Sequence, residues 1–120
     1  MGRIRFIGVD APEHDQHPFG PLAKRALEAL APPGTILRLE RDRENRGPHD
    51  RALRYLWVDG VMINWVMVRE GFSVVLTYPP DTRYVTAFRA AQDSARSERA
   101  GLWALDGFSC LPRSHRRGRC

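Results

Sequence analysis

Three charged side chains near the start of the chain are of types that can hold a phosphate, a cation and a water molecule. Arg5 lies in a stretch whose residues alternate in the manner of a β-strand, and Asp10 and Glu13 follow where that stretch ends. Pro12 cannot donate to a sheet and keeps the residue before it extended, so both carboxylates should lie on a stiff turn. The other interpretation is an ordinary solvated surface, because short motifs often occur without function.

A second arginine stands beside another predicted strand and favours a functional site over a solvated surface. Arg51 comes directly before residues 52–58, which are rich in aromatic and β-branched residues. That segment ends at Asp59-Gly60, a strong signal for a hairpin turn.

The elements that must position these residues follow from hydrophobic periodicity and from capping residues. Extended segments are expected at residues 1–9, 35–42, 52–58, 61–63 and 72–76. One helix should begin near Pro21 and end before Pro32-Pro33-Gly34. A second should have Asn64 as its N-cap and Gly71 just past its end, and a third should be capped by Asp81 or Thr82.

Together these segments resemble the staphylococcal nuclease (thermonuclease) family. The family carries a strand end R-x-x-G-[IV]-D-[AT]-P-E, a strand G-R-x-L-x-Y-[VL]-x-x-D-G, a helix N-x-x-[LM]-[VL]-x-x-G-[FY] and a closing [AS]-x-x-x-x-x-G-[LI]-W. The corresponding residues here are 5–13, 50–60, 64–72 and 95–103, in the family's order. Four pieces in register make the resemblance specific.

The resemblance implies an α+β fold, an OB-fold five-stranded β-barrel with three helices, which is an oligonucleotide-binding architecture. We expect a nuclease-like domain over residues 1–105 and a basic tail over residues 106–120 that is loose from residue 113 onward. The strand and D-G-D-T turn that precede this region in the family have no counterpart in the sequence. We therefore expect an N-terminally truncated barrel with an open edge, unless the true start codon lies upstream.

The resemblance also implies a role for each residue of the candidate site. Arg5 and Arg51 match the family's two catalytic arginines, which would grip the scissile phosphate, and Glu13 matches its proposed general base. Asp10 and the main-chain carbonyl of Ala11 match ligands of Ca²⁺, the cofactor that the family uses.

Two aromatic side chains are candidates for contact with the nucleotide. Tyr78 lies where the family has a tyrosine close to the substrate, and His49 is placed to stack on a base. Asp50, directly before Arg51, is positioned to divert that arginine into a salt bridge. Glu40 matches an acid of a structural charge network in the family, and we expect it to be structural.

We therefore expect a calcium-dependent nuclease that cleaves DNA or RNA, as single strands or frayed duplex, with little sequence preference. The alternative is a non-catalytic module that binds nucleic acid or protein, because the D-G-D-T aspartate, a second calcium carboxylate, is missing. The net charge of +5 favours an anionic partner. Lys24 is the only lysine among 19 basic residues, so the base composition of the gene is another explanation for the many arginines.

The 120 residues suffice for one domain, and the absence of a long apolar run predicts no membrane span. The resemblance suggests a secreted or cell-envelope protein if an upstream signal is missing, and a cytoplasmic one otherwise. Cys110 and Cys120 either close a small disulfide loop or are both free. The oligomeric state is open, with pairing through the open barrel edge as one option.

Overall fold

The computed structural model describes residues 4–120, in which short strands alternate with α-helices. The strands are β1 (Ile4–Phe6), β2 (Val9–Asp10), β3 (Arg38–Glu40), β4 (Ala52–Val58), β5 (Val61–Met62) and β6 (Val74–Val75). The α-helices are α1 (Phe19–Leu30), α2 (Ile63–Arg69), α3 (Val85–Ser97) and α4 (Pro112–Arg116), and 3₁₀ turns span Pro48–Asp50 and Gly101–Leu105. The α+β class is confirmed, while residues 1–3 of the expected first strand lie outside the described residues.

The longest strand, β4, is the centre of the main sheet. It pairs in parallel with β1 and antiparallel with β3 and β5, so the order is β1-β4-β3 with β5 beside β4. Strands β2 and β6 form a separate antiparallel pair. Within residues 4–120 the strands thus form two hydrogen-bonded sheets, which is compatible with the expected OB-fold although the barrel is not seen as closed.

The expected strand at residues 1–9 is interrupted, and this interruption shapes the candidate site. Gly8 has a φ of +80°, and a Cβ built on it would lie 2.6 Å from the ring of Phe88. The chain therefore turns between β1 and β2, and the glycine is required both for its backbone angle and for its small size. The turn buries Ile7 and Val9 in the core.

The helices pack their apolar faces against the main sheet and against one another. In α1, Ala23, Ala26 and Leu27 pack with Met67 of α2. In α3, Phe88 and Ala91 are buried in a cluster with Val9 and Tyr55. No helix within residues 4–120 is both long and apolar enough to cross a bilayer.

Two of the expected helix caps are wrong, because the side chains form hydrogen bonds with distant segments of the chain instead. Asn64 lies inside α2, is fully buried, accepts a hydrogen bond from the Leu56 amide and donates one to the Ile7 carbonyl. Asp81 accepts hydrogen bonds from the amides of Arg43 and Glu44. Helix α3 starts later, at Val85, so neither Asp81 nor Thr82 is its N-cap.

The expected strand at residues 35–42 is shorter, because it extends only where β4 lies alongside it. Its last residue, Glu40, accepts hydrogen bonds from Trp57 Nε1 at 2.8 Å and from the hydroxyl of Tyr84, and it pairs with Arg83 at 2.7 Å. These contacts confirm the structural role expected for Glu40.

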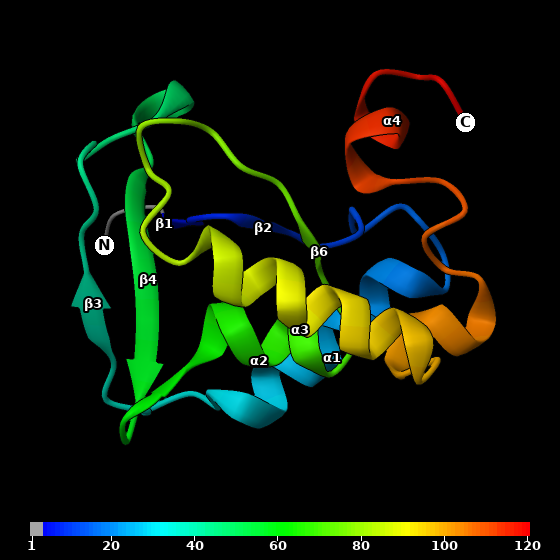
Figure 1. The fold of residues 1–120 in the computed structure, drawn as a ribbon, viewed down its shortest axis with the longest axis horizontal. Coiled ribbons are helices and arrows are strands. Elements are labelled where there is room, and N and C mark those ends of the chain that lie inside the picture. Colours follow the sequence, from blue (N-terminus) through cyan, green and yellow to red (C-terminus); the bar gives the residue numbers. More distant parts are fainter. Residues whose placement is uncertain (1–3) are drawn as a thin grey trace.

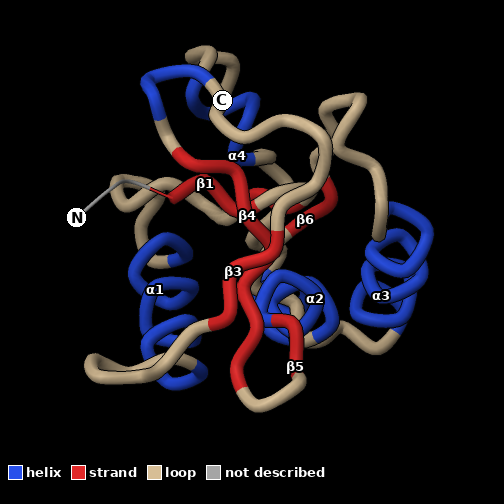
Figure 2. Tube along the Cα trace, turned by 90° about the vertical axis from the view of Figure 1, so that its left-hand side faces the viewer, coloured by secondary structure: helices blue, strands red, loops and turns tan. Residues whose placement is uncertain are grey.

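The basic tail is not loose, which corrects the expectation for residues 113–120. It contains α4 and is closed by a disulfide between Cys110 and Cys120, so of the two alternatives for the cysteines the structure shows the bonded one. Figures 1 and 2 show α4 and the C-terminal end on one side of the β1–β2 segment, with α1, α2 and α3 on the other. The division into residues 1–105 and 106–120 stays a prediction.

Candidate active site

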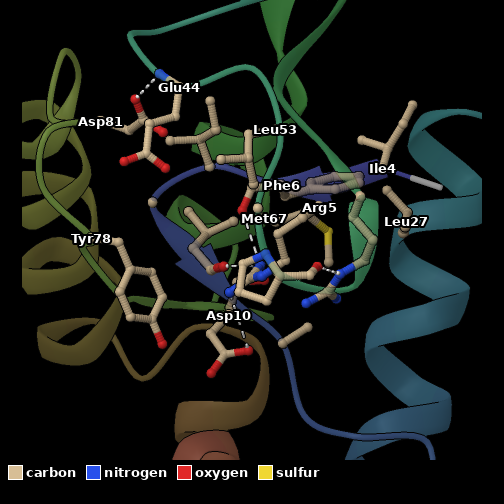
Figure 3. A pocket seen from close by; sticks show the side chains of 18 of the residues that line it. Ile4, Arg5, Phe6, Asp10, Leu27, Glu44, Leu53, Met67, Tyr78 and Asp81 are labelled. Atoms are coloured by element: carbon tan, nitrogen blue, oxygen red, sulfur yellow. Dashed lines mark hydrogen bonds and ion pairs between the residues drawn. The ribbon is translucent and has the colours of Figure 1, made fainter. Parts of the chain in front are cut away.

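A pocket of about 630 Å³ opens beside the β1–β2 turn. Six of the seven residues expected at the site line it: Arg5, Asp10, Ala11, Glu13, Arg51 and Tyr78. Figure 3 shows Arg5 and Asp10 pointing into the same space, with Tyr78 on one side and Leu27 of α1 on the opposite side. His49, the seventh, is exposed and does not line the pocket.

The parallel pairing of β1 with β4 brings the two candidate arginines together. In this register Arg5 lies opposite Leu53, and Arg51 precedes Leu53 by two residues. Since side chains alternate along a strand, Arg51 and Leu53 face the same side of the sheet as Arg5. Two arginines far apart in the chain thereby face one pocket.

The guanidinium of Arg5 is held by the turn that it helps to shape. Its Nη1 donates to the carbonyl of Phe6 at 2.9 Å and to that of Val9 at 2.8 Å, and Nη2 lies 3.9 Å from Asp10 Oδ1. Burial lowers the pKa of Arg5, Asp10 opposes this, and the positive charges of Arg51 and Arg116 lower the pKa further. The group remains charged at any working pH, and it lies close to two other cations.

The guanidinium of Arg51 is not diverted by its acidic neighbour. Asp50 pairs instead with Arg46, at 3.7 Å, and Arg46 also donates to the Asp50 carbonyl. Nε of Arg51 donates to the Pro48 carbonyl at 3.5 Å, a long contact. Within residues 4–120 no carboxylate pairs with Arg51, so its charge is available to an anion in the pocket.

The two candidate carboxylates differ in burial and share a rigid turn. Asp10 is 6% exposed at the end of β2, whereas Glu13 is half-buried. The Glu13 amide donates to Gln16 Oε1 at 2.9 Å, and the Gln16 amide donates to the Glu13 carbonyl at 2.9 Å. A carbon added at Gly20 would collide with that same Glu13 carbonyl, so α1 packs directly on the turn.

A third arginine, which the sequence reasoning missed, holds both carboxylates. Arg116 of α4 donates from Nη1 and Nη2 to the two oxygens of Asp10 at 2.9 and 2.8 Å. Its Nη1 also donates to Glu13 Oε1 at 2.7 Å. These hydrogen bonds raise the pKa of Arg116 above its ordinary value. The signal that could have found it is the Cys110–Cys120 spacing, because closing that loop prevents the basic tail from trailing into solvent.

The arrangement does not fit a bound cation while Arg116 is in place. Both oxygens of Asp10 already accept charged hydrogen bonds, and residues 4–120 contain no cluster of three His, Cys, Asp or Glu side chains that could hold a metal ion. A hard cation such as Ca²⁺ takes six to eight oxygen ligands. Asp10 and the half-buried Ala11 would supply only part of such a set.

Chemically, the pocket can bind an anion of phosphate type and hold a water molecule near Glu13. Arg5 and Arg51 supply the positive charge. Tyr78 is 57% exposed as a residue, and its ring offers a surface on which a nucleic-acid base can stack. A guanidinium binds phosphate through paired hydrogen bonds, which fixes orientation as well as charge.

Comparison with known proteins shows which family the chain matches and which proteins it is similar to. Residues 3–105 match a family model described as "Staphylococcal nuclease homologue". The chain is 30% identical over 112 residues to endonuclease YncB of Bacillus subtilis, covering 88% of this chain and 53% of that protein. It is 33% identical over 105 residues to thermonuclease of Staphylococcus intermedius, covering 84% of this chain and 62% of that protein. The chain thus spans less than two thirds of the length of these relatives.

Proposed function

Because the chain belongs to the staphylococcal nuclease family, we propose that it is a hydrolase that cleaves phosphodiester bonds of DNA or RNA with little sequence preference. The observation that carries the proposal is the convergence of Arg5, Arg51 and Glu13 on one pocket. Relatives named as an endonuclease and a thermonuclease support the reaction type.

The two arginines act on the phosphate. Arg5 is anchored by main-chain carbonyls on one edge of its guanidinium, so its position is set before substrate binds. Arg51 lies directly before the neighbouring strand β4 and is free of carboxylate partners among residues 4–120. Together they hold the phosphate oxygens and stabilise the negative charge that builds in the transition state. Preorganised charge of this kind requires no rearrangement during the reaction.

Glu13 is the proposed general base, and it must leave Arg116 to act. As a free carboxylate on the rigid turn, it can accept a proton from a water molecule that attacks the phosphorus. We also propose Ca²⁺ as the cofactor, held by Asp10 and the Ala11 carbonyl once Arg116 has moved away. The Tyr78 ring would contact a base of the substrate. His49 is exposed and does not line the pocket, so it is a weaker candidate for that role.

The test is cleavage of single-stranded and duplex DNA and of RNA by purified protein, with and without added calcium. Arg5→Ala and Arg51→Ala should each lower turnover about 10²–10³-fold, as expected for loss of a donor that stabilises transition-state charge. Lysine should not restore the rate at either position, because it lacks the planar fork. Arg89→Ala, an exposed arginine on α3, is the matched control and should cleave normally. Normal cleavage by Glu13→Gln would exclude Glu13 as the base.

A second candidate is a non-catalytic module that binds nucleic acid. The observation that favours it is the pairing with Arg116, which engages both oxygens of Asp10 and one oxygen of Glu13. The same assay separates the two functions. Salt-sensitive binding of DNA or RNA without cleavage at any calcium concentration would support the module.

We further propose an oxidising location, secreted or in the cell envelope, because the Cys110–Cys120 bond would be reduced in most cytosols. Thiol alkylation followed by mass spectrometry, on protein from its native source, tests this. Two alkylated cysteines would contradict the proposal.

A further inference from the structure

The segment from Cys110 to Cys120, here termed the C-terminal cap, is built as a closed unit. Its two end residues are joined by the disulfide, and α4 lies between them. Pro112, at the start of α4, is among the fully buried side chains, so the cap is seated on the domain. The residues that match the family model end at 105, and the cap therefore lies beyond the part of the chain that the family accounts for.

The cap is docked on one short stretch, the turn that carries the candidate carboxylates. Gln16, buried beneath the turn, donates to the Cys110 carbonyl at 3.4 Å. His115 Nε2 lies 2.8 Å from Asp15 Oδ1. Arg116 completes the set with its contacts to Asp10 and Glu13. Three contacts from different parts of the cap all reach residues 10–16, which indicates a specific docking rather than a chance ion pair.

The geometry of Arg116 is that of a substitute cation. Its guanidinium donates from Nη1 and Nη2 to both oxygens of Asp10, the proposed metal ligand. Nη1 also donates to an oxygen of Glu13, the proposed base. These bonds use three of the five N–H donors of Arg116, and its charge is shared by two carboxylates, so the carboxylates are its partners in this structure. Its side chain is 37% exposed, so the ion pairs are accessible to competing ions.

We propose that the C-terminal cap is an autoinhibitory element, in which Arg116 competes with a divalent cation for Asp10 and keeps Glu13 from acting as a base. This inference rests on the proposed function of the site. The disulfide keeps Arg116 close to its partners after each dissociation, because the closed loop limits how far α4 can move. Removing either the guanidinium or the loop closure should therefore open the site.

The primary test measures cation binding in the absence of any substrate. Calcium titration by calorimetry, or terbium luminescence as a probe of the same ligands, is carried out on the full chain and on Arg116→Ala. If Arg116 occupies the carboxylates most of the time, its removal should tighten cation binding about tenfold or more. Arg113→Ala, an exposed arginine of the same helix, is the matched control and should bind as the unaltered chain does. Equal cation affinity in all three proteins would overturn the inference.

A second variant keeps the test decisive if Arg116→Ala folds poorly. Cys110→Ser retains Arg116 but opens the loop, and it should tighten cation binding in the same direction by a smaller factor. Asp10→Asn in the Arg116→Ala background should abolish the gain, which shows that the cation binds at the released carboxylate. A gain that survives Asp10→Asn would contradict the proposed competition.

Cleavage assays on the same proteins separate this inference from the proposed function. If Arg116→Ala binds the cation more tightly but neither protein cleaves, the competition between Arg116 and the cation is supported and the proposed nuclease activity is refuted. Measurable and equal cleavage, with equal cation binding, by the unaltered chain and by Arg116→Ala would support the proposed nuclease activity and refute the autoinhibition.

Discussion

Replacement of Asn64 by alanine should destabilise the chain more than any change to an exposed polar residue. Asn64 is fully buried on α2, and its amide joins three elements: it accepts from the Leu56 amide of β4 and donates to the Ile7 carbonyl between β1 and β2. Alanine removes these two hydrogen bonds and a longer one, at 3.4 Å, to the Arg54 carbonyl, which keeps its bond from the Ile7 amide. Because the site is closed to solvent, the Leu56 amide and the Ile7 carbonyl would be left without partners.

The magnitude follows from those two unpaired groups. A buried donor or acceptor that loses its partner costs about 1–3 kcal/mol, so two such groups together cost about 2–6 kcal/mol. Total stabilities of small domains are about 5–15 kcal/mol, so the loss is a large fraction. At roughly 4 °C per kcal/mol for a domain of this size, the melting temperature should fall by about 8–24 °C.

Thermal and urea unfolding followed by circular dichroism measure this change. Asn45→Ala is the matched control, because Asn45 has the same chemistry, is exposed, and accepts a hydrogen bond from Arg54 at the surface. It should change the free energy of unfolding by less than about 0.5 kcal/mol. Asn64→Asp should also be destabilised, because a carboxylate cannot donate to the Ile7 carbonyl. A shift for Asn64→Ala no larger than that of the control would refute the account of Asn64 as the link between these elements.

Three further predictions concern the turn, acid stability and binding. Gly8→Ala should lower the free energy of unfolding by about 1–3 kcal/mol more than Gly34→Ala, because both glycines have positive φ but only Gly8 meets an aromatic ring; equal losses in denaturant melts would contradict this. Burial raises the pKa of Glu40, but hydrogen bonds from Tyr84, Trp57 and Arg83 outweigh it and leave the pKa below its ordinary value. A carboxylate whose pKa is lower in the folded protein than its ordinary value of about 4.3 stabilises the fold above that pH. This stability is lost as the pH falls through the lower, folded pKa. The melting temperature should therefore fall more steeply in acid for the unaltered chain than for Glu40→Gln. Binding of single-stranded DNA should weaken steeply with salt, with a logarithmic slope of about −0.7 for each phosphate contacted, whereas a salt-independent fluorescence titration would exclude phosphate contacts as the main source of affinity.

The local parts of the site could be predicted from the sequence, because the physical rules that position them act over a few residues. Arg5, Asp10 and Glu13 lie within one strand end and one proline-stiffened turn, and strand alternation and the proline geometry are local effects. The same holds for β4, whose bounds of Ala52–Val58 match the predicted segment. The resemblance to the family supplied the roles, since several motifs occurred in the family's order.

The contacts between distant residues were decided by the tertiary structure. The parallel register of β1 and β4 brings Arg51 and Arg5 to the same side of the sheet. Asn64, expected as a helix cap, is buried and forms hydrogen bonds with Leu56 and Ile7 instead. Arg116 reaches Asp10 across 106 positions of the chain, through a tail that composition alone describes as loose and basic. Periodicity and capping are properties of neighbours in sequence, whereas these contacts depend on which surfaces the whole fold brings together. For that reason the residues that could bind a phosphate were evident in the sequence, while the arginine that holds the two carboxylates was not.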